Sequence, residues 1–277
     1  MLKSQRLAVL PIDSYDLADE FAVLDGHEYD GKYDAFTFGS WSAHVLANGS
    51  GAESDTSFRP HDGGLALTEL GKQLPGIMSL VTAHFPLERL QWVRVFRAHD
   101  AIITPHVDFL EWGEAGTRLQ IPLRTSEESL LSENDTVYHL RRGEVWQIHS
   151  TVPHSALTAG EVTRLSLCLD FAGAQEPVAI RGDVPATAPV HLVERPAPTA
   201  AELEHLIGGT ALTRRSMRAD FRRFAALHFA RHAHAAAAFD WYLQAARRTG
   251  DDAIVAKAEA FRTYCIDKRL DGEAFAW

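Results

Sequence analysis

Three side chains able to bind a metal ion stand beside two apolar runs. His106 and Asp108 follow the run 101–104, and His154 lies further along the chain, just before another run. Residues two apart on an extended chain point to the same side, so His106 and Asp108 can reach one ion together. Two imidazoles and one carboxylate on one side of an ion leave its other side open, as iron(II) oxygenases require. The pattern therefore predicts a metal site made of His106, Asp108 and His154.

An arginine and a serine follow the second histidine. Arg164 and Ser166 are two apart in the apolar run 163–171, so they share one face of a predicted strand. A guanidinium binds a carboxylate through two parallel hydrogen bonds, and a hydroxyl can add another. The pair suits the distal carboxylate of 2-oxoglutarate. We therefore expect Fe(II) as the metal, with 2-oxoglutarate and O2 as co-substrates.

This interpretation has an alternative, because a His-x-Asp pattern also arises by chance. In the alternative, His106 and Asp108 only hydrogen-bond to each other inside a cupin-like sandwich. The presence of a later histidine and an Arg-x-Ser pair at predicted strand ends of one β module favours the metal site.

Short runs rich in branched and aromatic residues must position these side chains. Polar, turn-like stretches separate the runs at 98–100, 114–116, 133–135 and 141–143. Short strands at this spacing predict an antiparallel sandwich or barrel. Helices are expected at 13–26 and 74–85. The predicted strands are 7–10, 91–96, 101–104, 118–123, 136–140, 144–148 and 163–171.

The last third of the chain has a helical pattern. Residues 173–198 are rich in proline and alanine and predict a connecting segment. Thr199 and Glu202 then form a capping-box pattern, in which each side chain satisfies a backbone donor near the other. Further helices are predicted at 213–231, 234–248 and 252–270. We expect a β core with N-terminal helices over residues 1–180 and a helical C-terminal subdomain over 195–277, packed on the core.

Bulk composition excludes several classes of partner. The 277 residues carry a formal charge of -10 and have a pI of about 5.7, which argues against nucleic acid and anionic membranes. The two cysteines, Cys168 and Cys265, lie in apolar runs, so free buried thiols and a reducing compartment are expected. No apolar run approaches the ~20 residues that span a bilayer. We expect a cytoplasmic protein.

Four stretches resemble the motifs of bacterial free-L-proline hydroxylases of the cis-3 and cis-4 types, together with related pipecolic acid hydroxylases. They are residues 104–111, 134–146, 153–156 and 164–171, and a weaker similarity extends to 33–36 and the helical end. The resemblance implies an α+β fold whose core is a double-stranded β-helix, jelly-roll or cupin-like, with the C-terminal helices as a subdomain. It also implies an iron(II)- and 2-oxoglutarate-dependent dioxygenase that hydroxylates a ring carbon of a free cyclic amino acid.

The resemblance assigns roles to individual residues. His106, Asp108 and His154 match the iron ligands of the family, and Arg164 matches the arginine that binds 2-oxoglutarate, with Ser166 beside it. The substrate-binding positions of the family match Arg94, Arg118 and Trp146. By residue type alone, Arg118 fits a surface strand equally well, and Trp146 fits the core better than a substrate contact.

Val107 departs from the family pattern, which usually has arginine between the histidine and the aspartate. The substitution leaves L-proline, the larger ring of L-pipecolic acid and an open chain such as L-lysine as candidate substrates. Two other hypotheses stay open: a cupin-type metalloenzyme that does not use 2-oxoglutarate, and a non-enzymatic binding module. A small-molecule partner is expected in either enzyme, and a homodimer is a candidate assembly.

Overall fold

The structure is a computed structural model that describes residues 2–28, 33–55, 61, 64–108, 116–173, 178–182, 185–267 and 275–277. The turn expected at 114–116 and the end of the helix expected at 252–270 lie partly outside these residues.

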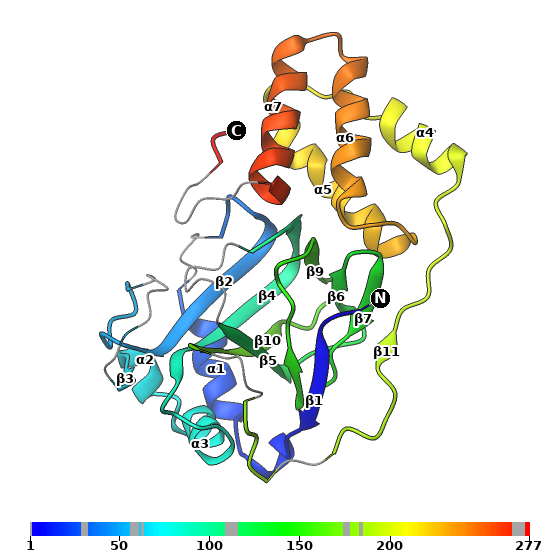
Figure 1. Ribbon diagram of the computed structural model, residues 1–277. Helices are drawn as coiled ribbons and strands as arrows, with labels where there is room; N and C mark the ends of the chain where they lie inside the picture. Colours follow the sequence, from blue (N-terminus) through cyan, green and yellow to red (C-terminus); the bar gives the residue numbers. More distant parts are fainter. Residues whose placement is uncertain are drawn as a thin grey trace.

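Eleven strands of the described residues form one curled antiparallel sheet (Figure 1). Their order is β1-β8-β5-β10-β4-β9-β6-β7-β11, with β2 paired to both β4 and β3. The curled sheet around a cavity confirms the expected cupin-like core of an α+β protein. The strands are β1 Gln5–Val9, β2 Thr37–Asn48, β3 Ala66–Leu67, β4 Leu90–His106, β5 Thr117–Arg124, β6 Ser129–Glu133, β7 Thr136–His139, β8 Glu144–Gln147, β9 His154–Thr158, β10 Arg164–Phe171 and β11 His191–Leu192.

Strand β4 connects the two halves of the sheet. Its first part pairs with β10, its last part pairs with β9, and β2 follows its other edge (Figure 1). The turn predicted at 98–100 is wrong, because the strand continues through these residues. Asp100 adopts a φ of 39°, and the β2 register shifts opposite it, so the polar residues form a bulge that bends the strand.

Helices lie on two sides of the sheet (Figure 1). The helix expected at 13–26 begins only at Ala18, after a 3-10 turn at Ile12–Ser14. Thr199 and Glu202 form the predicted capping box. The helices are α1 Ala18–Gly26, α2 Glu69–Lys72, α3 Pro75–His84, α4 Ala200–Gly208, α5 Met217–Ala230, α6 Ala237–Arg248 and α7 Asp252–Arg262, followed by a π turn at Thr263–Asp267.

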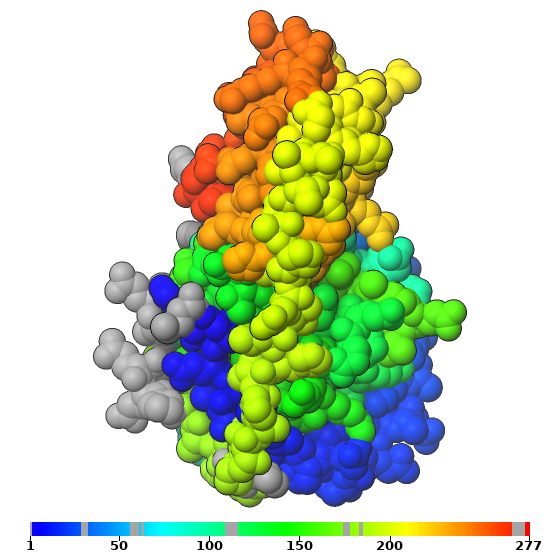
Figure 2. All heavy atoms as spheres, turned by 90° about the vertical axis from the view of Figure 1, so that its right-hand side faces the viewer, coloured from blue at the N-terminus to red at the C-terminus, as the bar shows by residue number. Residues whose placement is uncertain are grey.

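Buried apolar side chains form three clusters. One joins α1 and α3 to one face of the sheet, and a second joins α5, α6 and α7 to Phe38 and Ile102 of β2 and β4. The third, which includes Trp41 and Phe96, lies inside the curled sheet. The segment that leads to α4, yellow-green in Figure 2, runs along the surface of the β part up to the helices. The two groups of helices therefore pack on the outside and leave the inside of the sheet for the site.

Two further predictions concern disulfide formation by the cysteines and the presence of membrane-spanning helices. Cys168 and Cys265 are both buried, and neither forms a disulfide bond within the described part of the chain, as predicted. Within the described ranges, no helix combines the length and the apolar character needed to cross a bilayer.

We predict that Gly39→Ala destabilises the fold by about 2 kcal/mol or more. Gly39 has a φ of 85°, and a Cβ placed on it would lie 1.8 Å from the backbone oxygen of Asp100 at the β4 bulge. Gly26→Ala is the matched control, because a Cβ there meets nothing within 4 Å. Urea denaturation of the two variants measures the difference, and equal midpoints would contradict the prediction.

Candidate metal centre

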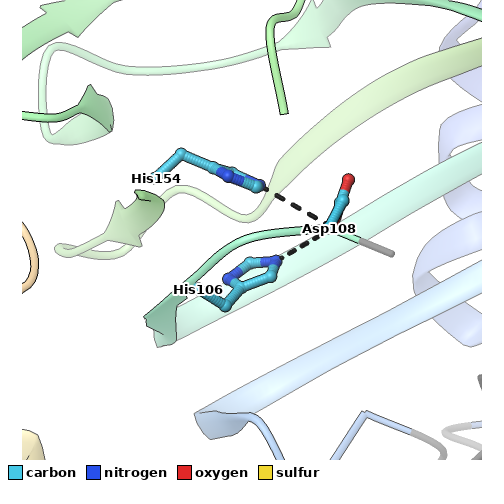
Figure 3. A group of neighbouring side chains, drawn as sticks. All are labelled: His106, Asp108 and His154. Carbon is cyan, nitrogen blue, oxygen red and sulfur yellow. Dashed lines mark ion pairs between the residues drawn. The ribbon is translucent and has the colours of Figure 1, made fainter. Parts of the chain in front are cut away.

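The three predicted metal ligands lie together at one end of the sheet interior. Their ligand atoms are all within 4.8 Å of one another. Asp108 Oδ1 is 3.2 Å from His106 Nε2 and 3.8 Å from His154 Nε2 (Figure 3). His106 ends β4 and His154 begins β9, and the antiparallel register places them directly opposite each other. Pairing between strands far apart in sequence thus brings the two imidazoles together.

Backbone hydrogen bonds hold the chain just beyond β4. The Asp108 N–H donates to the Ser150 carbonyl at 2.9 Å, and the Val107 N–H donates to the Cys265 carbonyl at 3.0 Å. The first bond comes from the β part, and the second comes from the π turn after α7. Asp108 is therefore positioned from both sides, although it stands outside regular secondary structure.

The orientation of both imidazole rings suits metal binding. His106 Nδ1 lies 2.7 Å from the Thr104 carbonyl, and His154 Nδ1 lies 2.9 Å from the Val152 carbonyl. A carbonyl only accepts, so each Nδ1 donates to it, and each Nε2 is left facing Asp108. Burial, with the nearby His106, lowers the pKa of His154 to about 4, so this ring is neutral at pH 7.

The carboxyl of Asp108 is ionised at pH 7. Burial by itself would raise the pKa of Asp108, but the Arg118 charge and the close contact with His106 outweigh burial and hold it well below its usual range. Arg118 Nη1 donates to Asp108 Oδ2 at 2.6 Å. Oδ1 is the oxygen that faces the two imidazoles. Two imidazole nitrogens and one carboxylate oxygen form a donor set that fits Fe(II).

A second carboxylate, which the sequence analysis missed, fixes the arginines of the site. Asp170 of β10 is 1% exposed and accepts from Arg118 Nε at 2.8 Å. It also forms an ion pair with Arg94 of β4. Because β10 lies between β4 and β5, Asp170 reaches one arginine on each neighbouring strand. Its place on the same strand face as Arg164 was a signal in the sequence, but its partners depend on the strand order.

A cavity opens beside these residues. It encloses about 830 Å³ of space between atoms, part of it open to solvent, and the His106, Asp108 and His154 side chains form part of its wall. The predicted substrate residues Arg94 and Arg118 also line it. Its polar lining further includes Arg164 and Gln120, and its aromatic lining is made of Tyr33, Phe36, Trp41 and Phe96.

Two predicted residues lie outside this lining. Trp146 is fully buried, and its Nε1 donates to Glu144 Oε2 at 2.9 Å. Its ring packs against Tyr138 at 5.1 Å between centroids. Ser166 is buried on β10, paired across the sheet with Phe96 and Pro122. The structure therefore places Trp146 and Ser166 in the packing around the cavity.

Arg164 presents a buried guanidinium to the cavity. It is 3% exposed, and its Nε and Nη1 have no hydrogen-bond partner among the described residues. Trp41, Ala98 and Arg164 form one row across β2, β4 and β10, and the guanidinium lies 5.1 Å from the centre of the Trp41 ring. Burial lowers the pKa of Arg164 to about 10, so it keeps its charge at pH 7. A buried cation with unused donors is suited to an anionic ligand.

The curled sheet and the grouping of His106, Asp108 and His154 are typical of oxidoreductases with a double-stranded β-helix core. Comparison with known proteins agrees. The family described as Aspartyl/Asparaginyl beta-hydroxylase matches residues 16–173, and the family described as L-proline 3-hydroxylase, C-terminal, matches residues 178–273.

Relatives match over most of the chain. An L-proline cis-4-hydroxylase of Rhizobium meliloti (strain 1021) is 29% identical over 98% of both chains. L-proline cis-3-hydroxylase 2 of a Streptomyces species is 29% identical over 99% of both chains, and L-proline cis-3-hydroxylase 1 is 30% identical over 88% of both. The chain belongs to the L-proline cis-hydroxylase family, which confirms the resemblance seen in the sequence motifs.

We predict that His154→Ala weakens binding of Fe(II) or Co(II) by ~100-fold or more, because it removes one of three donors. Calorimetric titration of metal-free protein with Co(II) measures the affinity. His232→Ala is the control, since this side chain is 58% exposed and lies outside the cluster. Unchanged affinity in His154→Ala would disprove the assigned site.

We predict that Asp170→Asn destabilises the protein by about 3 kcal/mol, because it leaves two buried guanidinium groups without their shared counter-charge. Asp13→Asn is the control, because its side chain is 88% exposed in its ion pair with Arg142. Denaturant midpoints compare the variants. A midpoint of Asp170→Asn equal to that of the control would show that the buried carboxylate does not stabilise the arginines.

Proposed function

We propose that this protein is an iron(II)- and 2-oxoglutarate-dependent dioxygenase that hydroxylates a ring carbon of a free cyclic amino acid, L-proline or L-pipecolic acid. The observation that carries the proposal is the position of the Arg164 guanidinium. It lines the same cavity as His106, Asp108 and His154, with two of its nitrogen atoms lacking a hydrogen-bond partner in the described part of the chain. Such an arginine suits the distal carboxylate of 2-oxoglutarate.

In this proposal the donor atoms hold the metal from one side. His106 Nε2, His154 Nε2 and Asp108 Oδ1 are the ligands, and the bond from Arg118 to Oδ2 keeps the carboxylate in one orientation. Bound iron(II), with O2 and 2-oxoglutarate, would supply the oxidation: one oxygen atom enters a C–H bond of the substrate, and the other enters the succinate left when 2-oxoglutarate loses CO2. The residues themselves bind, orient and shield.

The substrate carboxylate is assigned to Arg94 and Arg118. Both line the cavity, and Asp170 fixes both guanidinium groups. A carboxylate held there would lie on the side of the cavity next to Asp108. This position would orient the substrate ring towards the metal. Tyr33, Trp41 and Phe96 cover the cavity with apolar surface and limit the entry of water. Ser166 and Trp146 support this wall from their buried positions.

The purified protein, supplied with Fe(II), 2-oxoglutarate and O2, should release succinate when L-proline or L-pipecolic acid is added. Mass spectrometry and NMR should find one oxygen atom added to a ring carbon. A panel that includes L-lysine separates a cyclic from an acyclic substrate. Both a metalloenzyme that does not use 2-oxoglutarate and a simple binding module predict no succinate with any amino acid, and that result would overturn the proposal.

We predict that Arg164→Leu raises the KM for 2-oxoglutarate by ~10-fold or more, because a charge-assisted bidentate contact contributes about 1.5–3 kcal/mol. Arg164→Lys, which keeps the charge but loses the planar fork, should fall between the wild type and the leucine variant. Arg215→Leu is the control, because Arg215 is exposed in the loop before α5. Steady-state succinate release gives KM, and unchanged values in Arg164→Leu would place 2-oxoglutarate elsewhere.

A further inference from the structure

The described lining of the cavity includes a buried amide oxygen that the proposed function leaves unused. Gln120 of β5 lines the cavity, and its Oε1 is buried without a hydrogen-bond partner within the described ranges. Buried amide oxygens are normally hydrogen-bonded, and exceptions concentrate where a ligand or water completes them. Gln120 is therefore a candidate ligand-binding residue.

Its neighbours do not provide the missing donor. The register pairs Gln120 with Cys168 on β10 and with Trp146 on β8. The Trp146 N–H donates to Glu144 instead. The Ser155 hydroxyl, elsewhere on the cavity wall, donates to the Ile103 carbonyl at 2.6 Å. A ligand that carries an N–H group can supply the donor that the protein does not.

The charges of the cavity specify the kind of ligand group. Arg94, Arg118 and Arg164 only donate hydrogen bonds, so they suit carboxylates and cannot bind a protonated amine. Asp108 is the carboxylate in the described lining, and it is held by Arg118 at one oxygen and faces the imidazoles with the other. For a cationic nitrogen, Gln120 offers an acceptor that is committed to neither arginine nor metal.

The position of Gln120 matches the shape of an amino acid head group. Arg118 and Gln120 are two residues apart on β5, so they share one strand face at a separation of about 7 Å. The carboxylate and the nitrogen of an α-amino acid are attached to the same carbon. A carboxylate bound at Arg118 therefore places the nitrogen near the adjacent position on the strand.

We propose that Gln120 accepts a hydrogen bond from the protonated amino nitrogen of the substrate and so selects α-amino acids over carboxylic acids that lack the nitrogen. This inference rests on the proposed function, because it assumes that the substrate carboxylate binds at the cavity arginines. A site that hydrogen-bonds a substrate N–H discriminates against an analogue without it, since the acceptor is then left unpaired.

The test measures binding without turnover. Protein loaded with Ni(II) and 2-oxoglutarate is titrated calorimetrically with L-proline and L-pipecolic acid, and with their nitrogen-free analogues cyclopentanecarboxylate and cyclohexanecarboxylate. Gln120→Leu removes the acceptor at similar volume, and Gln120→Met is the second variant if the leucine does not fold. Gln147→Leu on β8 is the matched control, because Gln147 lies in the same sheet outside the cavity lining.

We expect Gln120→Leu to weaken binding of the cyclic amino acid by ~10-fold and to leave the affinity for its nitrogen-free analogue within about twofold. The KM for the amino acid should rise, and the KM for 2-oxoglutarate should stay unchanged. Equal weakening of both ligands, or of neither, overturns the role of Gln120 while the enzyme assignment stands. If the wild-type protein binds none of the amino acids, the proposed function and this inference both fail.

Discussion

The two oxygens of Asp108 have different partners, and the arrangement of the site depends on this division. Oδ2 is bonded to Arg118, whereas Oδ1 faces His106 and His154. A carboxylate held in this way offers a metal one oxygen rather than two, so the three proposed ligands would lie on one side of a bound ion. The remaining side is left for small ligands, which a facial arrangement requires.

This division in turn depends on the order of the strands. Arg118 is on β5, Asp108 follows β4, and β10 runs between them. Asp170 of β10 binds Arg118 from one side and Arg94 from the other, so the guanidinium that orients Asp108 is itself held by a buried carboxylate. Buried charges are tolerated when they are paired and hydrogen-bonded, and this alternation of cations and anions satisfies that condition.

The chain has a net negative charge, whereas three arginine side chains line its cavity. The protein carries -10 overall, but Arg94, Arg118 and Arg164 all line the cavity. Asp108 and Asp170 compensate the first two, whereas Arg164 lies over the ring of Trp41. The acidic composition argued against nucleic acid as a ligand class, but it contained no information on where the arginines would gather. The electrostatic potential inside the cavity, and not the net charge of the chain, determines which small anions bind.

The sequence predicted those parts of the site that depend on local geometry. His106 and Asp108 could be grouped because residues two apart on a strand share a face, and the Arg164 position followed from the same rule. Gln120 and Asp170 could not be assigned, because their roles depend on which strands lie beside β5 and β10. Strand β2 was not predicted, because Gly39, Ser40 and Ser42 interrupt its apolar pattern, although pairing with β4 stabilises it. The bulge at Asp100 was taken for a turn because aspartate favours both.

The helical end of the chain contributes directly to the metal site. The Cys265 carbonyl accepts the Val107 N–H, so the π turn after α7 fixes the residue between two proposed ligands. The preceding side chain, Tyr264, stacks on Phe36 of the cavity wall with centroids 5.4 Å apart. Both contacts join residues matched by one family to residues matched by the other, because the first match ends at 173 and the second begins at 178. Loss of the bond between Val107 and Cys265 would remove one of the two backbone hydrogen bonds that hold the chain at Val107 and Asp108. The C-terminal helices therefore help to position the backbone that carries the proposed metal ligands.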